Sequence, residues 1–156
     1  LPPPDLIIIG ATHIAISLAR IAREVGFRVT VIDARSVLAT EDRFPDVYRL
    51  IRGWPDETMP GLFLGSQSSV VVLTHDPKFD IPALACALRS PAGYIGALGS
   101  RVTHQQRKAR LLEQGFSEAD LGRIRSPIGL DIGARTPGEL AVSVLAEVVA
   151  VRYGRT

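Results

Sequence analysis

The chain has 156 residues, which is the size of one domain with one sizeable core. Hydrophobic residues make up 46% and charged residues 22%, a composition that excludes a disordered chain and favours a globular one. The 18 Lys and Arg residues nearly balance the 16 Asp and Glu residues and are spread along the sequence, so we expect no nucleic-acid partner.

Residues 1–5, Leu-Pro-Pro-Pro-Asp, predict an extended leader or linker and resemble no signal peptide. The longest apolar segment, residues 140–151, is too short to span a bilayer. The only cysteine, Cys86, excludes an internal disulfide and lies among Ala and Leu residues, so we expect it to pack in the core. Together these features predict a cytoplasmic protein without membrane contact.

The first elements form one strand–helix–strand unit. Residues 6–9 are an uninterrupted apolar run that ends on Gly10, as in a strand buried on both faces. Apolar residues then recur at helical spacing over 14–25. A second apolar strand, 29–32, ends on Asp33. This pattern is typical of a nucleotide-binding βαβ unit.

Further strands and helices alternate along the rest of the chain. We expect strands at 70–73 and 94–98, helices at 81–88, 102–114, from 118 and at 137–152, and a short strand with a loop at 124–133. Residues 36–69 are the least regular part, with turns and one short strand at 47–51. The alternation predicts a single Rossmann-like domain over residues 6–153, a doubly wound, mainly parallel sheet with helices on both faces.

The last predicted helix is almost entirely apolar. Its polar residues are confined to a narrow stripe of Glu139, Ser143 and Glu147. We expect such a helix to be covered widely, either inside this domain or by a partner, and this favours a homodimer or contact with a further domain.

In doubly wound sheets, ligands bind at the carboxyl ends of the strands, near the point where the strand order reverses. Four loops follow predicted strands there, and their residues are the candidate binding site. These residues are Gly10, Ala11, Thr12, His13, Ile14 and Ala15; Asp33 and Arg35; Thr74, His75 and Asp76; and Gly99, Ser100 and Arg101.

The first of these loops is an altered dinucleotide fingerprint. Gly10 and Ala15 fit the pattern Gly-x-Gly-x-x-Gly/Ala, but Thr12 replaces the glycine that lets the backbone approach a pyrophosphate. The helix N-terminus behind the loop still favours an anion, and Asp33 is placed where an acid binds ribose. The loop predicts a nucleotide or other phosphorylated ligand; the alternative is a turn that binds nothing.

The other loops leave two interpretations open. His75 could bind a ligand or move a proton with Asp76 holding its ring, or Asp76 could simply cap the next helix. Arg101 could clamp an anion or be merely solvated. Although His13 and His104 also lie near these loops, no metal-ligand spacing is present, and we expect no metal site. We also assign no catalytic residue.

Several segments together resemble the XdhC/CoxI family of xanthine dehydrogenase accessory proteins. The two long motifs are Tyr-Ile-Gly-Ala-Leu-Gly-Ser-Arg at 94–101 and Pro-Ile-Gly-Leu-Asp-Ile-Gly-Ala-Arg-Thr-Pro at 127–137. Phe-Pro-Asp at 44–46, Gly-Trp-Pro-Asp-Glu at 53–57 and Thr-His-Asp at 74–76 follow the family's order. The resemblance extends over nearly the whole chain.

The resemblance implies an accessory protein rather than an enzyme. Members of this family bind molybdenum cofactor (molybdopterin), assist its sulfuration and deliver it to hydroxylases such as xanthine dehydrogenase, so a hydroxylase and a sulfurase are the expected partners. This chain corresponds to the C-terminal Rossmann domain, and the family's N-terminal domain has no counterpart in it. The family also typically has glycine where this chain has Thr12.

Two other functions fit the same residues. One is an NAD(P)-dependent oxidoreductase domain, although no Tyr-Lys pair or second catalytic domain is visible. The other is a ligand-free Rossmann module that acts only in protein association, through the apolar last helix.

Overall fold

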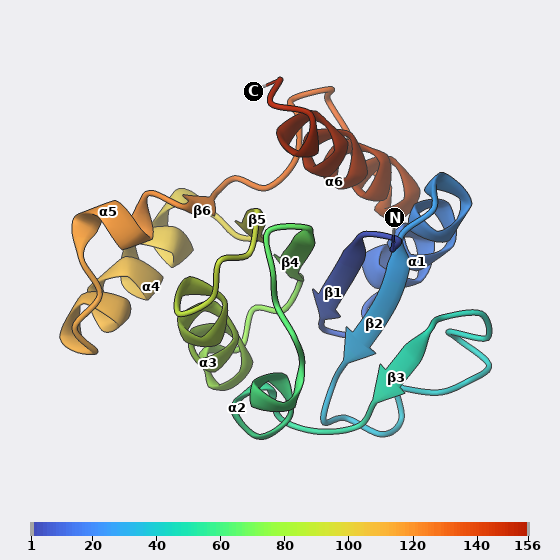
Figure 1. Cartoon of the computed structure of the whole chain (residues 1–156), viewed down its shortest axis with the longest axis horizontal. Coiled ribbons are helices and arrows are strands. Elements are labelled where there is room, and N and C mark those ends of the chain that lie inside the picture. Colours follow the sequence, from blue (N-terminus) through green and yellow to red (C-terminus); the bar gives the residue numbers. More distant parts are fainter. Residues whose placement is uncertain (1, 156) are drawn as a thin grey trace.

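Runs of β-branched and other apolar residues form the centre of the molecule, a sheet of six parallel strands (Figure 1). The computed structural model describes residues 2–155. The strands are β1 (Asp5–Ile9), β2 (Arg28–Ile32), β3 (Arg49–Ile51), β4 (Ser68–Val72), β5 (Tyr94–Ala97) and β6 (Ile124–Arg125). Their order is β3-β2-β1-β4-β5-β6, so the direction of winding reverses between β1 and β4. The predicted doubly wound fold is confirmed.

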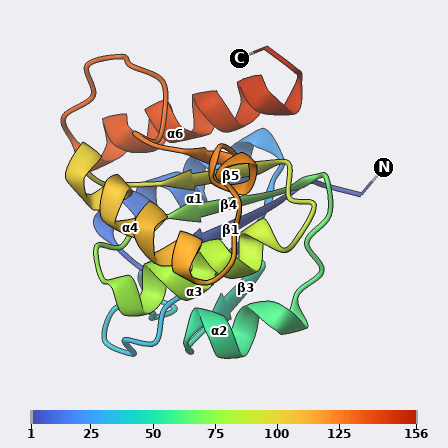
Figure 2. The same ribbon diagram turned by 90° about the vertical axis from the view of Figure 1, so that its left-hand side faces the viewer.

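Helices cover both faces of the sheet. On one face, α1 (His13–Val25) and α6 (Pro137–Arg152) pack against each other and against the sheet. The other face is covered by α2 (Pro55–Thr58), the 3-10 turn η1 (Met59–Gly61), α3 (Pro77–Leu88), α4 (Arg101–Glu113) and α5 (Glu118–Leu121). Figure 2 shows this layering, with α6 above the sheet and α2 and α3 below it. No helix within residues 2–155 is long and apolar enough to cross a membrane.

Side-chain caps fix the start of most helices. Thr12, Asp76 and Ser100 accept hydrogen bonds from backbone N–H groups in the first turns of α1, α3 and α4. The capping patterns expected before the last two helices are both present, with reciprocal bonds in α5 and α6. The loops after β1, β4 and β5 therefore each end in a capped helix at the same edge of the sheet.

The structure differs from the sequence-based expectations at several boundaries. Helix α3 begins at Pro77 and not at 81, because Asp76 caps it and a proline fits the first helical position. The segment expected to be irregular contains α2, which also begins with a proline. The predicted leader is shorter than expected within the described residues: Pro4 accepts a hydrogen bond from the Arg28 N–H, and β1 begins at Asp5. Leu1 lies outside the described residues.

Helix α6 buries two of the three residues of its polar stripe, Ser143 and Glu147, whereas Glu139 at its first turn is exposed. The Glu147 carboxylate accepts hydrogen bonds from the Tyr94 hydroxyl at 2.5 Å and from the Gly129 N–H at 3.1 Å. The Ser143 hydroxyl donates to the Leu130 carbonyl at 2.6 Å. The bonds of Gly129 and Leu130 attach the long loop after β6 to α6. Part of the apolar surface of this helix is exposed.

Candidate functional site

Four loops meet at the carboxyl edge of the sheet, because neighbouring parallel strands end there. The loops after β2, β1, β4 and β5 follow one another in that order along the edge. The loops after β1 and β4 touch closely: a Cβ on Gly10 would lie 2.5 Å from Cγ2 of Thr74, and Gly10 has a φ of +106°. Only glycine satisfies both conditions, so this residue fixes the sharp turn between β1 and α1.

The Asp33 carboxylate holds two of these loops together. Its Oδ2 accepts hydrogen bonds from the Ala11 N–H at 2.8 Å and from Nη2 of Arg35 at 2.7 Å. Its Oδ1 accepts from the N–H and the Nε of Arg35, both at 2.9 Å. A carboxylate has about four lone-pair sites, and here all of them are occupied by protein donors. Asp33 is also fully buried, so it is not placed to bind a ribose.

Opposing effects set the pKa of Asp33. Burial acts to raise it, but the hydrogen bonds from Arg35 and from the Ala11 N–H outweigh burial, and the pKa lies below its ordinary value. The Ala11 carbonyl in turn accepts a hydrogen bond at 2.9 Å from Nη2 of Arg43. Both backbone groups of Ala11 are therefore used within the protein.

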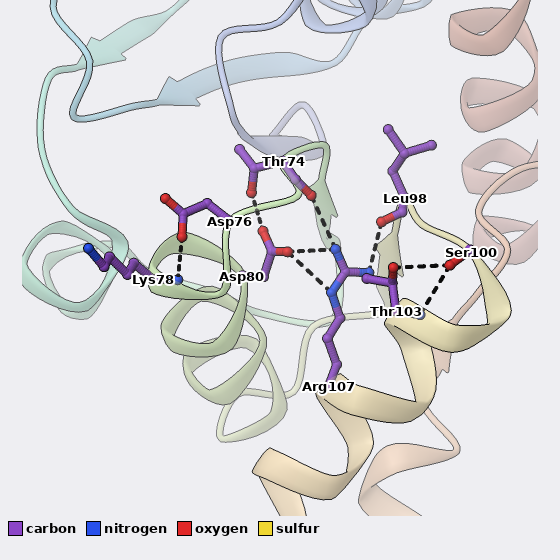
Figure 3. A network of polar contacts seen from close by, with 8 residues as sticks. All are labelled: Thr74, Asp76, Lys78, Asp80, Leu98, Ser100, Thr103 and Arg107. Atoms are coloured by element: carbon purple, nitrogen blue, oxygen red, sulfur yellow. Dashed lines mark hydrogen bonds and ion pairs between the residues drawn. The ribbon is translucent and has the colours of Figure 1, made fainter.

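A second buried network joins the loops after β4 and β5 (Figure 3). Arg107 on α4 forms an ion pair with Asp80 on α3, with 2.6 Å between Nη2 and Oδ2. The same guanidinium donates to the carbonyls of Leu98 at 2.8 Å and Thr74 at 3.1 Å. It also packs beside Gly99, which is half-buried; a Cβ there would lie 3.0 Å from Nη1 of Arg107.

Thr74 is part of this network as well. Its hydroxyl donates to the Asp80 carboxylate. Burial raises the pKa of Asp80, although the bonds from Thr74 and Arg107 oppose that shift. Thr74 is thus turned inward, and its hydroxyl is not available to a ligand.

The other predicted site residues of these loops point into solvent. His75, Asp76, Ser100 and Arg101 are all exposed. Asp76 caps α3 by accepting a hydrogen bond from the Lys78 N–H at 3.0 Å, which is the second of the two interpretations left open for it. Ser100 caps α4.

The glycine loop presents a further exposed group. His13 is exposed at the first position of α1, while Thr12, Ile14 and Ala15 are partly or fully buried in the first turn. Within residues 2–155, no three His, Cys, Asp or Glu side chains are grouped so that they could hold a metal ion.

Sequence reasoning missed several residues of this edge. Trp54, just after β3, stacks on Phe79 in the first turn of α3, with ring centroids 4.5 Å apart. Arg107 falls within the predicted helix 102–114 and no pattern in the sequence sets it apart, yet it is buried. The single tryptophan of the chain, set in a turn that follows a strand, was the one signal that could have been used.

The exposed groups at this edge suit a phosphorylated ligand with a flat ring. Arg35 and Arg101 supply positive charge, His13 and Ser100 supply hydrogen-bond donors, and Trp54 supplies an aromatic surface. Exposed cations can bind a phosphate group, and an exposed aromatic face can stack on a planar ring.

The strand order, the glycine turn after β1 and the acid after β2 define a Rossmann-type domain. The family model described as the XdhC Rossmann domain matches residues 6–148. The chain belongs to this family, and the resemblance seen in its motifs is confirmed.

Individual relatives agree with this assignment. A protein of Bacillus subtilis (strain 168) that is named as a probable xanthine dehydrogenase subunit is 34% identical over 151 residues, covering 97% of this chain and 44% of that protein. The molybdenum cofactor insertion chaperone PaoD of Escherichia coli (strain K12) is 40% identical over 89 residues, or 57% of this chain and 28% of that protein.

A solved structure gives the same result in three dimensions. A protein described as a xanthine dehydrogenase from Bacillus halodurans matches with a TM-score of 0.84 and 30% identity, covering 99% of this chain and 44% of that one. The chain therefore spans less than half the length of each of these relatives.

Proposed function

We propose that this chain is an accessory module that binds molybdenum cofactor, or a related phosphorylated nucleotide, for the maturation of xanthine dehydrogenase-type hydroxylases. The observation that carries the proposal is the 40% identity to a molybdenum cofactor insertion chaperone, over a segment that covers 57% of the chain. The exposed donors at the carboxyl edge support it, because Arg35 and Arg101 suit a phosphate and Trp54 suits a pterin ring.

The state of Asp33 argues against the nicotinamide alternative. Dinucleotide-binding domains use the acid after β2 to bind ribose hydroxyls. Here both oxygens of Asp33 already accept hydrogen bonds from Ala11 and Arg35, and opening that arrangement would leave the buried Ala11 N–H without a partner. A ligand without a ribose in that position meets no such cost.

Cofactor retention by the purified chain tests the proposal. Molybdenum cofactor released from a hydroxylase is mixed with the chain without oxygen, and bound pterin and molybdenum are measured after desalting. We expect both to co-elute with the chain and to be transferred to a hydroxylase that lacks cofactor. Stabilisation by NADH or NADPH without retention of the cofactor would contradict the proposal.

Matched arginine variants sharpen that experiment. Arg101→Ala removes an exposed cation at the carboxyl edge and should weaken retention several-fold. Arg20→Ala removes a cation of α1 that is also exposed but lies outside the candidate site, and should leave retention unchanged. Equal retention by both variants would mean that the anionic group does not lie where we place it.

The proposed partners are a molybdenum hydroxylase and a sulfurase. The first is suggested by relatives named as a cofactor insertion chaperone and as part of a xanthine dehydrogenase. The second follows from the family resemblance alone. Both are tested by co-elution of the purified proteins with the cofactor-loaded chain, and a partner that never co-elutes is excluded.

A homodimer is the other proposed association. Between α1 and α6 lies an apolar groove of about 910 Å³. Val142 is 51% exposed and Val25, which helical spacing had placed on the core side of α1, is 54% exposed. Ala146 and Ala150 lie in the same groove and are small enough for a second helix to approach closely.

A two-fold axis across this groove would let the same surface of a second copy cover it. Ala146→Glu places a charge in the groove and should convert a dimer to a monomer in sedimentation at several concentrations. A wild-type chain that sediments as a monomer at every concentration would exclude the dimer.

A further inference from the structure

Trp54 and Phe79 form a rigid aromatic stack at the end of β3. Their rings are 4.5 Å apart between centroids and inclined by 19°. Phe79 is buried, with 3% of its surface exposed, whereas Trp54 keeps 37% of its surface accessible to solvent. Phe79 thus acts as a fixed base, and the outer ring of the stack stays available for contact.

Consecutive contacts connect this stack to the glycine loop. The Arg35 guanidinium lies 5.4 Å from the centroid of the Phe79 ring and is held by two bonds to Asp33. Asp33 in turn accepts a hydrogen bond from the Ala11 N–H. The stack therefore belongs to the same rigid edge as the loop between β1 and α1. Because 44% of the Arg35 side chain is exposed, its guanidinium can also contact a ligand.

We propose that Trp54 is the surface on which the flat heteroaromatic ring of the ligand stacks. The indole of Trp54 provides a broad π-face, and stacking of this kind accepts any planar bicyclic ring. A pterin and a purine share this chemistry. The inference rests on the proposed function, which supplies a ligand with such a ring.

The ring site can be tested directly, because Trp54 is the only tryptophan of the chain. Its fluorescence is titrated with a phosphorylated pterin, with guanosine monophosphate and with inorganic phosphate. Stacking predicts saturable quenching by the ligand with the correct ring and no quenching by phosphate. Quenching by the pterin alone identifies a pterin site, and quenching by the nucleotide alone identifies a purine site. If neither ring changes the fluorescence, the inference is wrong.

Affinity measurements on variants separate stacking from a structural role. Trp54→Leu should weaken binding of the quenching probe roughly tenfold, whereas Trp54→Phe keeps a stacking ring and should weaken it far less. Tyr48→Leu is the matched control, since Tyr48 is 56% exposed and lies before β3, at the opposite edge of the sheet. Thermal unfolding of each variant shows whether the fold is intact. Equal affinity of Trp54→Leu and wild type would overturn the inference.

A further experiment distinguishes failure of the stacking inference from failure of the proposed function. Retention of released molybdenum cofactor is measured on wild type and Trp54→Leu by pterin and molybdenum content. If wild type retains the cofactor and Trp54→Leu retains it equally, the stacking inference fails while the proposed function stands. If wild type retains no cofactor but a nucleotide quenches Trp54, the ring site stands and the proposed binding of molybdenum cofactor fails.

Discussion

Arg107 and Asp80 form an ion pair that is almost completely buried, with exposed side-chain fractions of 3% and 2%. The pair lies between α3 and α4, and the same guanidinium donates to the carbonyls of Leu98 and Thr74, which lie in the loops after β5 and β4. The carboxyl edge of the sheet is therefore held in shape by a charge pair that is closed off from solvent. Removal of either partner would leave the other charged and unpaired in the core.

We first predict that Arg107→Met and Asp80→Asn lower the free energy of unfolding by about 3 to 5 kcal/mol. Denaturant unfolding followed by circular dichroism measures the change. The control is Asp46→Asn, which removes an ion pair to Arg23 whose side chains are more than 60% exposed. That variant should change stability by less than about 1 kcal/mol. A small effect at Arg107 would mean that water replaces the pair.

The second prediction concerns Asp33 and pH. Because its pKa is lower in the folded chain than in the unfolded one, its contribution to stability is present above the unfolded pKa, roughly 3.9. It is lost as the pH falls through the folded pKa. Asp33→Asn should thus cost about 1 to 3 kcal/mol at pH 7, and the difference from wild type should shrink at acid pH. Urea unfolding at several pH values checks this. A pH-independent difference would contradict it.

The third prediction concerns Gly10. A Cβ added there would lie 2.5 Å from Thr74, on a backbone with φ of +106°. Gly10→Ala should therefore destabilise the fold by about 1 to 3 kcal/mol. Gly138→Ala is the matched control, since Gly138 lies in the first turn of α6 with open space around it. It should be neutral or slightly stabilising in thermal unfolding. Equal effects of the two substitutions would refute the close contact.

The fourth prediction concerns the buried pair of Tyr94 and Glu147. Burial and then the hydrogen bond to Glu147 raise the pKa of the Tyr94 hydroxyl well above its usual value. The absorbance titration should thus show one tyrosine that ionises only when the chain unfolds in alkali, and Tyr94→Phe should abolish that step. The same substitution should cost about 1 to 2 kcal/mol, because Glu147 loses a donor. Tyr153→Phe, at a residue 65% exposed, should cost almost nothing.

The fifth prediction concerns Cys86, which packs against the core cluster on the α3 side of the sheet. Burial raises the pKa of its thiol, with Arg89 opposing the shift only in part. Since the thiolate is the reactive form, a disulfide reagent should modify the folded chain far more slowly than the unfolded chain at pH 7. Similar rates in water and in denaturant would show that Cys86 is reactive in the folded protein.

The exposed and the buried members of the predicted site could not be told apart from sequence. Three of these residues follow apolar strands and have oxygen atoms in their side chains, namely Asp33, Thr74 and Asp76. In the fold, Asp33 and Thr74 are buried and bound by internal hydrogen bonds, whereas Asp76 is exposed although it also caps α3. Their positions relative to Arg35 and Arg107 decide this, and such contacts between loops leave no local pattern.

The sequence alone determined most of the elements and their alternation, because apolar runs, helical periodicity and caps such as Thr136 with Glu139 are local signals. Its two long motifs also determined the family. Only the tertiary structure decided which polar groups hold the carboxyl edge together and which face a ligand. Arg107 is buried and Trp54 is stacked yet accessible because of partners from α3, and those contacts exist only once the sheet has brought distant segments side by side.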